Sequence, residues 1–248
     1  MTISMALRAC LINFFFSPRK RERPWANAPA NAFWKNSTSA SWDRNSRSAE
    51  REQEQLKILD ANSAGTLQGG PTFTLGNRVF RGFWNLTWLL LASWTPPPFN
   101  SWRVMLLRLF GAKVAPTAFV YGSARIWYPP QLEIGRRAVI GRRVTVYSVA
   151  MITLRDYANV SQGAHLCSAG HDIDDAHFQT VARPITIGAQ AWIAAEAFVG
   201  PGVTIGEGAV LGARGCTFSD LEPWTVYAGN PARALRARKV HRSAQPRA

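Results

Sequence analysis

Residues 185–216, ITIGAQAWIAAEAFVGPGVTIGEGAVLGARGC, decide the fold because an aliphatic residue returns at every sixth position. These aliphatics are Ile187, Ile193, Val199, Ile205 and Leu211, and the fourth residue after each is Ala191, Ala197, Val203, Ala209 and Gly215. Such a period is neither helical nor two-fold, and it is typical of a solenoid in which each flat side is one short strand. Three hexads would close a triangular coil, with the aliphatics pointing inward and successive coils stacked as parallel sheets.

The pattern predicts an all-β fold, the left-handed parallel β-helix of hexapeptide repeats, which is an exception to the right-handed rule for parallel crossovers. Small residues at the short corners would permit this turning. The hexads extend back to about Val114, and slips of two residues, one of them at the Pro129-Pro130 corner, preserve the inward alternation. Between residues 168 and 183 the hexads stop for an excursion. We therefore expect a β-helix domain over residues 113–222 with a functional loop at 168–183.

The composition suits one domain with appendages, since the chain has 248 residues of which 47% are hydrophobic. The formal net charge of +14 permits an anionic partner such as a nucleotide, a phospholipid surface or a nucleic acid, but arginine-rich ends account for it equally well. We expect no nucleic-acid partner. The three cysteines, Cys10, Cys167 and Cys216, have no metal spacing and an odd count, which favours a reducing compartment and hence the cytoplasm.

The two ends of the chain differ from the hexads. The apolar run before the basic cluster 19–23 has the wrong order for a secretory signal, and residues 36–48 are rich in Ser, Asn and Arg, which offer little apolar surface to bury. We expect residues 1–70 to be a disordered extension and linker. Residues 223–248 are expected to form a C-terminal segment that contacts the cofactor and ends in a basic tail.

Residues 77–112 are rich in Trp and Leu and predict two helices separated by the proline run 96–98. Ser101 is a plausible cap and Gly111 a plausible stop for the second helix. The apolar run is too short to span a bilayer, which takes about 20 residues. One interpretation is a cap over the open end of the β-helix, which would otherwise expose a sheet edge. The other is peripheral contact with a membrane interface, and the two are compatible.

In the membrane interpretation, basic side chains lie near lipid phosphates and indole rings lie at the headgroups of the inner leaflet. The basic residues of the segment are Arg78, Arg81, Arg103 and Arg108, and the tryptophans proposed as anchors are Trp84, Trp88 and Trp94.

Four motifs then suggest a family. They are Gly-His-Asp-Ile-Asp at residues 170–174, Pro-Ile-Thr-Ile-Gly at 184–188, Ala-Trp-Ile-Ala at 191–194 and Tyr-Ala-Gly-Asn-Pro-Ala-Arg at 227–233. Together with the hexads they resemble the hexapeptide-repeat O-acetyltransferases related to maltose and nodulation-factor acetyltransferases. The resemblance is greater to the colanic-acid-biosynthesis acetyltransferases (WcaF-like). It covers residues 77–239, and it is more specific for the fold and for acetyl-CoA than for the acceptor.

The resemblance implies acetyl-CoA-dependent transfer to a sugar hydroxyl in exopolysaccharide or lipid-linked glycan biosynthesis, by a homotrimer with active sites between subunits. His171 matches the catalytic histidine of the family. This agrees with the chemistry, because an alcohol is a poor nucleophile until a base takes its proton, and imidazole suits that task at neutral pH. Asp172, Asp174 and Asn159 are candidate acceptor-binding residues, although an acidic loop can also be merely solvated. Relatives often carry a loop glutamate that steadies the histidine; near that place this chain has Gln179, so the partner that orients His171 stays open.

For acetyl-CoA, the resemblance points to six residues: Trp192, Ala194, Ala195, Gly212, Ala213 and Arg233. Small residues would let pantetheine lie against the backbone, and the guanidinium of Arg233 would suit a CoA phosphate. The chain departs from the family at Phe218-Ser219-Asp220, where many relatives have Thr-Lys-Asp, so a lysine that contacts CoA is missing. Trp192 as a simple core residue is the alternative.

Two other functions stay open. His165, His171 and His177 are six apart, as in β-helices of the γ-carbonic-anhydrase type that bind zinc between subunits. The first ends a hexad while the other two lie in the excursion, so a shared face is not assured and we expect no metal. A membrane-associated β-helix scaffold without enzymatic activity is the second alternative.

Overall fold

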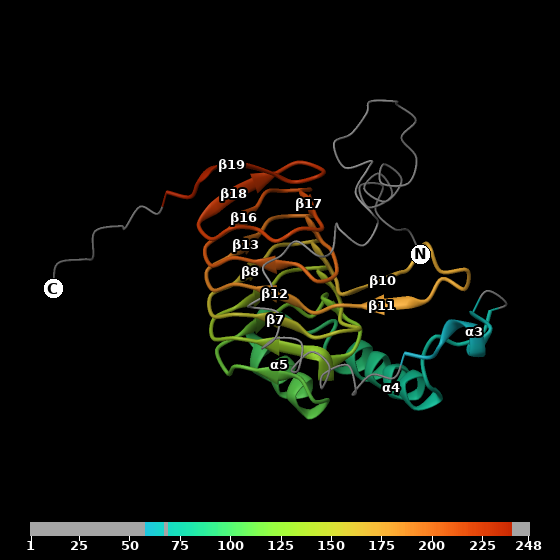
Figure 1. The fold of residues 1–248 in the computed structure, drawn as a ribbon. Coiled ribbons are helices and arrows are strands. Elements are labelled where there is room, and N and C mark those ends of the chain that lie inside the picture. Colours follow the sequence, from blue (N-terminus) through green and yellow to red (C-terminus); the bar gives the residue numbers. More distant parts are fainter. Residues whose placement is uncertain (1–57, 67–68, 240–248) are drawn as a thin grey trace. The chain divides into compact units, whose positions relative to one another are not determined.

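The repeating aliphatics build a stack of coils in which each coil gives one short strand to each of three parallel sheets (Figure 1). This computed structural model describes residues 58–66 and 69–239, all of which belong to the unit Leu56–Ala248. The predictions of a disordered extension over residues 1–57 and of a basic tail over 240–248 lie outside the described residues.

The three sheets are named here by the order in which the chain visits them. The first contains β1 (Lys113–Val114), β4 (Leu132–Ile134), β7 (Ile152–Leu154), β12 (Ile185–Ile187) and β15 (Thr204–Ile205). The second contains β2 (Phe119–Val120), β5 (Val139–Ile140), β8 (Asn159–Val160), β13 (Trp192–Ile193), β16 (Val210–Leu211), β18 (Thr225–Ala228) and the antiparallel β19 (Arg233–Ala237). The third contains β3 (Arg125–Ile126), β6 (Thr145–Tyr147), β9 (His165–Cys167), β14 (Phe198–Val199) and β17 (Cys216–Thr217).

The core lies inside the coils, where the hexad aliphatics stack in register. In the second sheet the stacked residues are Val120, Ile140, Val160, Ile193 and Leu211, each 0% exposed. Burial of apolar surface at about 25 cal/mol per Å² is the main stabilising term for such a core. The parallel β-helix that the hexads predict is confirmed.

The corners depart from the expectation of small residues. Arg137, Tyr157 and Gln190 adopt left-handed backbone conformations, with φ of 53°, 61° and 57°, and their side chains are exposed. This conformation costs a residue other than glycine about 1–2 kcal/mol. The cost is offset by hydrogen bonds between coils, since Tyr157 N donates to Arg136 O at 2.8 Å and Gln190 N to Asp156 O at 3.0 Å. A column of large exposed side chains is thereby held along the corner between the first and second sheets.

Two helices cover the end of the stack at the first coil (Figure 1). They are α4 (Leu75–Leu91) and α5 (Asn100–Leu109), joined through the 3₁₀ helix η2 (Pro97–Phe99). Trp84 and Trp88 are buried between α4 and the coil, and their indole N–H groups donate to Ile126 O at 2.7 Å and to Gly122 O at 3.0 Å. These bonds satisfy carbonyls that the stack would otherwise leave unpaired at its end.

The start of α5 differs from the prediction. The helix begins at Asn100 rather than after a Ser101 cap, and its first turn has no side-chain cap. Asn100 instead binds the edge of β2, because its amide donates to Ala118 O at 2.8 Å and accepts from Val120 N at 2.9 Å. The predicted cap by Ser101 does not form, because Asn100 already belongs to the helix and fixes its first turn to the coil.

A short segment before α4 also folds against the β-helix domain. Residues 58–66 contain α3 (Ala61–Ala64), and Asp60 caps this helix by accepting from Asn62 N at 3.0 Å. These residues fall in the range 1–70 for which the composition predicts disorder. Leu59, Ala61 and Thr66 form hydrogen bonds with residues of the excursion, more than 100 positions away in the chain. Local composition cannot predict contacts between segments so far apart. A second 3₁₀ helix, η3 (Pro129–Gln131), forms the predicted proline corner.

Candidate active site

A β-hairpin interrupts the coils between β9 and β12. Its strands are β10 (Ala169–His171) and β11 (Thr180–Ala182), paired antiparallel with His171 opposite Thr180. Buried Ser168 fixes its base, since its hydroxyl donates to Tyr147 O at 2.8 Å and accepts from Ala150 N at 2.9 Å. The excursion predicted over residues 168–183 is therefore an ordered arm anchored in the coil stack.

His171 lies at the end of β10 with an exposed side chain. Its Nδ1 is 2.8 Å from Phe178 O, which a left-handed backbone conformation at Phe178, φ 54°, holds in place. A carbonyl oxygen only accepts hydrogen bonds, so this contact assigns the proton to Nδ1. The lone pair of Nε2 is then available to take a proton from a bound group. Phe178 is a candidate site residue that the sequence does not reveal, because it contacts His171 through its backbone oxygen.

Gln179 does not orient His171. Its side-chain oxygen accepts from Ala61 N at 2.6 Å, and its amide donates to Leu59 O at 3.4 Å and Thr180 O at 3.2 Å. Thr66 adds a bond from its hydroxyl to His177 O at 3.1 Å. Gln179 and Thr66 thus hold the segment 58–66 against the arm that carries His171.

The two acidic candidates form the tip of the hairpin. Asp172 accepts from Asp174 N at 3.0 Å, which is a local turn bond, and Asp172 N pairs with Gln179 O at 2.9 Å. Both carboxylates are exposed, and among the described contacts neither is bonded to His171. Any acceptor-binding role for them therefore stays a prediction, beside their turn-forming role.

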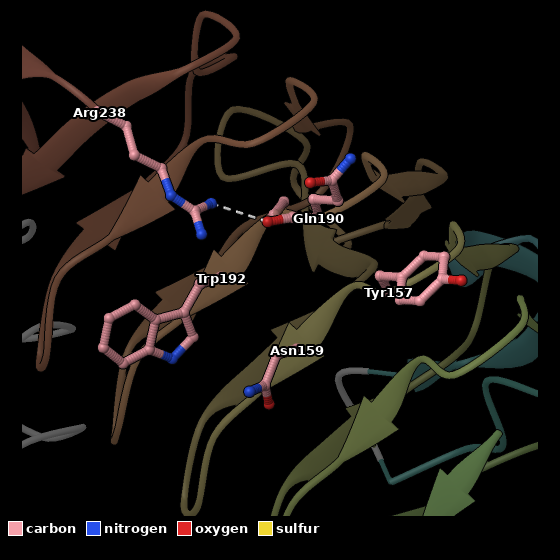
Figure 2. A pocket seen from close by; sticks show the side chains of 6 residues that line it. Tyr157, Asn159, Gln190, Trp192 and Arg238 are labelled. Carbon is pink, nitrogen blue, oxygen red and sulfur yellow. Dashed lines mark hydrogen bonds between the residues drawn. The ribbon is translucent and has the colours of Figure 1, made fainter. Parts of the chain in front are cut away.

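Asn159 and Trp192 are register partners on neighbouring strands of the second sheet. With Tyr157, Gln190, Ala191 and Arg238 they line a pocket of ≈ 690 Å³ (Figure 2). Trp192 is 44% exposed, and its indole donates to Ser161 Oγ at 2.8 Å. This bond fixes the ring while leaving its face open, so the interpretation of Trp192 as a core residue is wrong.

Tyr157, Gln190 and Arg238 are pocket residues that sequence reasoning missed. Tyr157 and Gln190 occupy the corner two residues before Asn159 and Trp192, so the repeat itself contained the signal for them. Arg238 follows the last coil and carries no periodic signal. Its guanidinium donates to Gln190 O and to Gly208 O, both at 2.8 Å, which places a cation at the pocket edge (Figure 2).

The other cofactor candidates extend from this pocket. Ala194 and Ala195 follow β13 at the corner between the second and third sheets, and Gly212 and Ala213 occupy the same corner one coil further on. Arg233 begins β19 and is exposed. Five of these six candidates are thus on or next to strands β13 and β16, and the sixth is on the outermost strand of the same sheet. The structure places them on one side of the β-helix, as a single extended ligand requires.

His171 is separated from this side within one chain. The arm leaves the corner between the third and first sheets, and in a triangular coil that corner lies opposite the second sheet, which carries Trp192. The described pocket accordingly contains no residue of the arm. Within one chain, therefore, the candidate base His171 and the pocket at Trp192 are not brought together.

The three histidines are not grouped within one chain. Among residues 58–66 and 69–239 no group of three or more His, Cys, Asp or Glu side chains is arranged to hold a metal ion. His165 is on β9, with its ring centroid 5.4 Å from that of Phe198, and burial lowers its pKa to about 4. Its Nε2 has no hydrogen-bond partner in the part of the chain that the structure describes. At neutral pH, His165 is thus an uncharged residue of the third sheet that packs against Phe198 on the neighbouring strand.

The lowered pKa of the partly buried His165 predicts a pH dependence of stability. Its pKa is about 4 in the folded protein, below the 6.5 of a free histidine, so the unfolded chain binds the proton more readily. This contribution to stability is fully present above pH 6.5 and is lost as the pH falls towards 4, by up to about 3 kcal/mol. Urea unfolding at several pH values in this window should show a flatter profile for His165→Leu than for His177→Leu. Equal pH profiles of stability for the two variants would contradict a lowered pKa of His165.

Two solved structures with the same fold are named acetyltransferases. A hexapeptide-repeat-containing acetyltransferase from Vibrio cholerae O1 biovar eltor, complexed with acetyl coenzyme A, has a TM-score of 0.60 at 25% identity, with 67% of this chain and 91% of that chain covered. A galactoside acetyltransferase in complex with coenzyme A has a TM-score of 0.61 at 25% identity, with 68% and 85% covered. No protein-family model matches the chain.

The sequence similarity to a curated relative identifies the family: 39% identity over 166 residues, which is 67% of this chain and 91% of the relative. The chain belongs to the hexapeptide-repeat acetyltransferases. That relative is the putative colanic acid biosynthesis acetyltransferase WcaF of Escherichia coli (strain K12). The resemblance noted in the sequence is confirmed.

Proposed function

We propose that the protein transfers the acetyl group of acetyl-CoA to a sugar hydroxyl during biosynthesis of an exopolysaccharide or a lipid-linked glycan. Membership of the acetyltransferase family supports the acetyl transfer, and the name of the curated relative favours a polysaccharide pathway. The observation that carries the proposal is the 2.8 Å contact between His171 Nδ1 and Phe178 O, which leaves Nε2 as the proton acceptor.

In the proposed reaction, Nε2 of His171 takes the proton of the sugar hydroxyl as its oxygen attacks the thioester carbonyl carbon. The tetrahedral intermediate carries its negative charge on the former carbonyl oxygen. When that intermediate collapses, the carbon–sulfur bond breaks and the imidazolium returns the proton to the departing CoA sulfur. The hydrogen bond to Phe178 O stabilises the imidazolium and keeps the ring in one orientation through both proton transfers.

The second sheet is proposed as the wall that binds both substrates. Trp192 and Tyr157 offer aromatic faces and Asn159 an amide, groups that suit the apolar faces and hydroxyls of a sugar. The corner residues Ala195 and Ala213 have short side chains, so pantetheine can approach the backbone there. Arg233 is exposed near the end of this wall, where a guanidinium suits a CoA phosphate.

The proposed active unit is a homotrimer in which His171 of one subunit meets the wall of its neighbour. The separation of His171 and Trp192 within one chain supports this, because a complete site then needs a second copy. Cyclic symmetry would give three equivalent sites. The free thiol of Cys167 is in keeping with the reducing cytoplasm, where we place the reaction.

The test combines two inactive variants in one trimer. His171→Asn removes the base and Trp192→Ala removes the wall, so each variant alone should be nearly inactive. If the two residues come from different subunits, every mixed trimer regains about one intact site out of three. Turnover is measured as release of the CoA thiol with a panel of sugars, sugar nucleotides and lipid-linked oligosaccharides.

In the test sample the two variants are unfolded and refolded together, so that mixed trimers form. In the control the two variants are folded separately and then mixed, so that any activity in it reports exchange of subunits. Activity that fails to return in co-folded trimers would assign both residues to a site within one chain. Wild-type protein that releases no CoA thiol with any hydroxyl acceptor would contradict acetyl transfer itself.

A further inference from the structure

The helical end of the protein has a second apolar face that points away from the coils. We call it the exposed apolar face, and it contains Leu75, Val79, Phe83, Leu86, Leu89, Leu90, Trp94, Phe99, Trp102, Met105 and Leu109. Trp94 is 73% exposed and Leu109 is 76% exposed. Helix α4 is therefore apolar on both sides, with Trp84 and Trp88 buried and the opposite side uncovered. A contiguous apolar patch of this kind marks an interaction surface.

The exposed indoles are arranged to present carbon rather than polar groups. Trp94 Nε1 donates to Leu90 O, and Trp102 Nε1 donates to Leu91 O, both at 2.7 Å. Because these N–H groups are already bonded, both rings can enter an apolar medium without leaving a donor unpaired. The second bond also joins α4 to α5, so the two helices present their outer sides together.

The coils next to this face are strongly basic. No acidic residue occurs between Asp60 and Glu133. Residues 113–155 contain one lysine and six arginines against one glutamate, whereas residues 185–222 at the far end contain one arginine against four carboxylates. Six exposed cations of the first two coils lie on all three sides of the stack. One of them, Arg136, forms a salt bridge with Asp156. We call the other five the basic collar: Lys113, Arg125, Arg137, Arg142 and Arg143.

We propose that the exposed apolar face and the basic collar dock the protein on an anionic lipid bilayer, with the coil axis pointing away from the membrane. Coils are spaced by about 4.8 Å, so the collar begins within about 10 Å of the stack end. This height is comparable with the Debye length of about 10 Å at 0.1 M salt. No described helix is long and apolar enough to cross the bilayer, and the protein lies on the surface instead.

A second copy of the chain fits this face less well than a lipid surface. A two-fold contact through the exposed apolar face would bring two basic collars towards each other, and like charges at an interface oppose association. Anionic headgroups instead complement the collar, while the acyl boundary accepts the Trp, Leu and Phe side chains.

The structure changes which residues of the helical segment serve this contact. Arg103 is fully buried and donates to Val120 O at 2.7 Å, and Arg81 stacks on Trp127 at 4.3 Å. Both cations are committed to the fold, as are Trp84 and Trp88. Of the seven residues that the sequence suggested, only Arg78, Arg108 and Trp94 are exposed. The collar supplies the charge that was expected from the helices.

Docking on the membrane does not require the acetyl transfer reaction. The conclusion drawn from it about the acceptor rests on the proposed function. A membrane-bound acetyltransferase would meet an acceptor sugar held on a lipid carrier in the same surface layer. The class of acceptor that follows is a lipid-linked glycan rather than a free sugar.

The experiment uses the full chain and vesicles of phosphatidylcholine alone or with about a third phosphatidylglycerol. The wild-type protein should co-sediment with anionic vesicles in about 0.05 M salt and much less in about 0.5 M salt. Leu86→Glu combined with Leu90→Glu should weaken binding at least tenfold, since two charges would then enter the interface, at about 1.4 kcal/mol per tenfold change. Leu235→Glu on β19, where Leu235 is 63% exposed, is the matched control.

The collar is tested separately. Arg142→Gln with Arg143→Gln should weaken binding to anionic vesicles by about fivefold for each charge removed, with little effect on the residual binding in high salt. Arg236→Gln at the far end of the coils is the control, because this exposed arginine lies on β19.

Three results would overturn the proposal. One is a wild-type protein that ignores anionic vesicles in low salt, and another is a control variant that loses binding as much as its test variant. The third is loss of a larger assembly, seen by light scattering, when Leu86 and Leu90 become glutamates, which would make the face a contact between copies. Turnover with acetyl-CoA and a soluble acceptor separates membrane docking from acetyl transfer. The His171→Asn variant should still bind vesicles, and the variant with glutamate at Leu86 and Leu90 should still transfer acetyl groups.

Discussion

Replacing His171 with asparagine is expected to lower acetyl transfer by about 10²–10⁴-fold, the usual contribution of a positioned general base. Asparagine can still donate a hydrogen bond towards Phe178 O, which in the wild type accepts from His171 Nδ1 at 2.8 Å. The arm should therefore keep its shape while the proton acceptor at Nε2 is lost. Initial rates at saturating acetyl-CoA would report the loss in kcat.

The matched control is His177→Asn, which changes the same residue type in the same arm. His177 contacts the arm through its backbone, where its N donates to Asp175 Oδ1 at 2.6 Å, so its imidazole is not required by the proposed reaction. Its variant should retain most of the turnover. Turnover near the wild-type level for His171→Asn, with circular dichroism unchanged in both, would remove His171 from the mechanism.

Trp84→Ala is expected to destabilise the protein by about 3–5 kcal/mol, the cost of deleting a large buried aromatic side chain. Trp84 is 1% exposed, and its ring centroid lies 5.0 Å from those of both Trp88 and Phe110. The variant would also leave Ile126 O without the indole N–H that it accepts at 2.7 Å. Urea unfolding would show a lower midpoint.

Trp94→Ala is the control for this loss, because Trp94 is 73% exposed on the same segment. A surface substitution of this kind usually changes stability by less than about 0.5 kcal/mol. Similar midpoints for Trp84→Ala and the wild type would mean that the helices are not part of the cooperative core.

The sequence predicted the coils well because one chemical rule repeats at every sixth residue. An inward aliphatic such as Ile193 has the same environment in every coil, so its position in the repeat predicts its burial. The excursion was also predicted, since it is the place where that rule stops. Tyr157 and Gln190 also recur with the repeat, but they lie at corners. At a corner the hexad pattern determines the backbone conformation and leaves the side chain free to vary, so it did not identify these two as pocket residues.

The helical segment was harder to interpret. Helix α4 is apolar on two sides, so its sequence does not state which tryptophans face the coil and which face outward. Arg103 resembles a surface residue by type, yet it is buried because five backbone and hydroxyl oxygens surround its guanidinium. Phe178 O and the bonds of Gln179 involve backbone atoms or segments far apart in the chain, which leave no local signature.

The end of the stack at β19 bears on polymerisation. A parallel solenoid is in principle a short fibre, since another copy's coil could continue each sheet at its last strand. Here the chain itself occupies those positions: Gly206 N donates to Leu221 O at 2.8 Å, Cys216 N to Gly229 O at 3.0 Å, and β18 pairs with β19. Because β19 runs antiparallel and exposes Arg233 and Arg236, a further parallel coil meets the wrong strand direction and a positive charge. At this end the chain thus covers the edge of its own second sheet, where a further parallel coil would otherwise add.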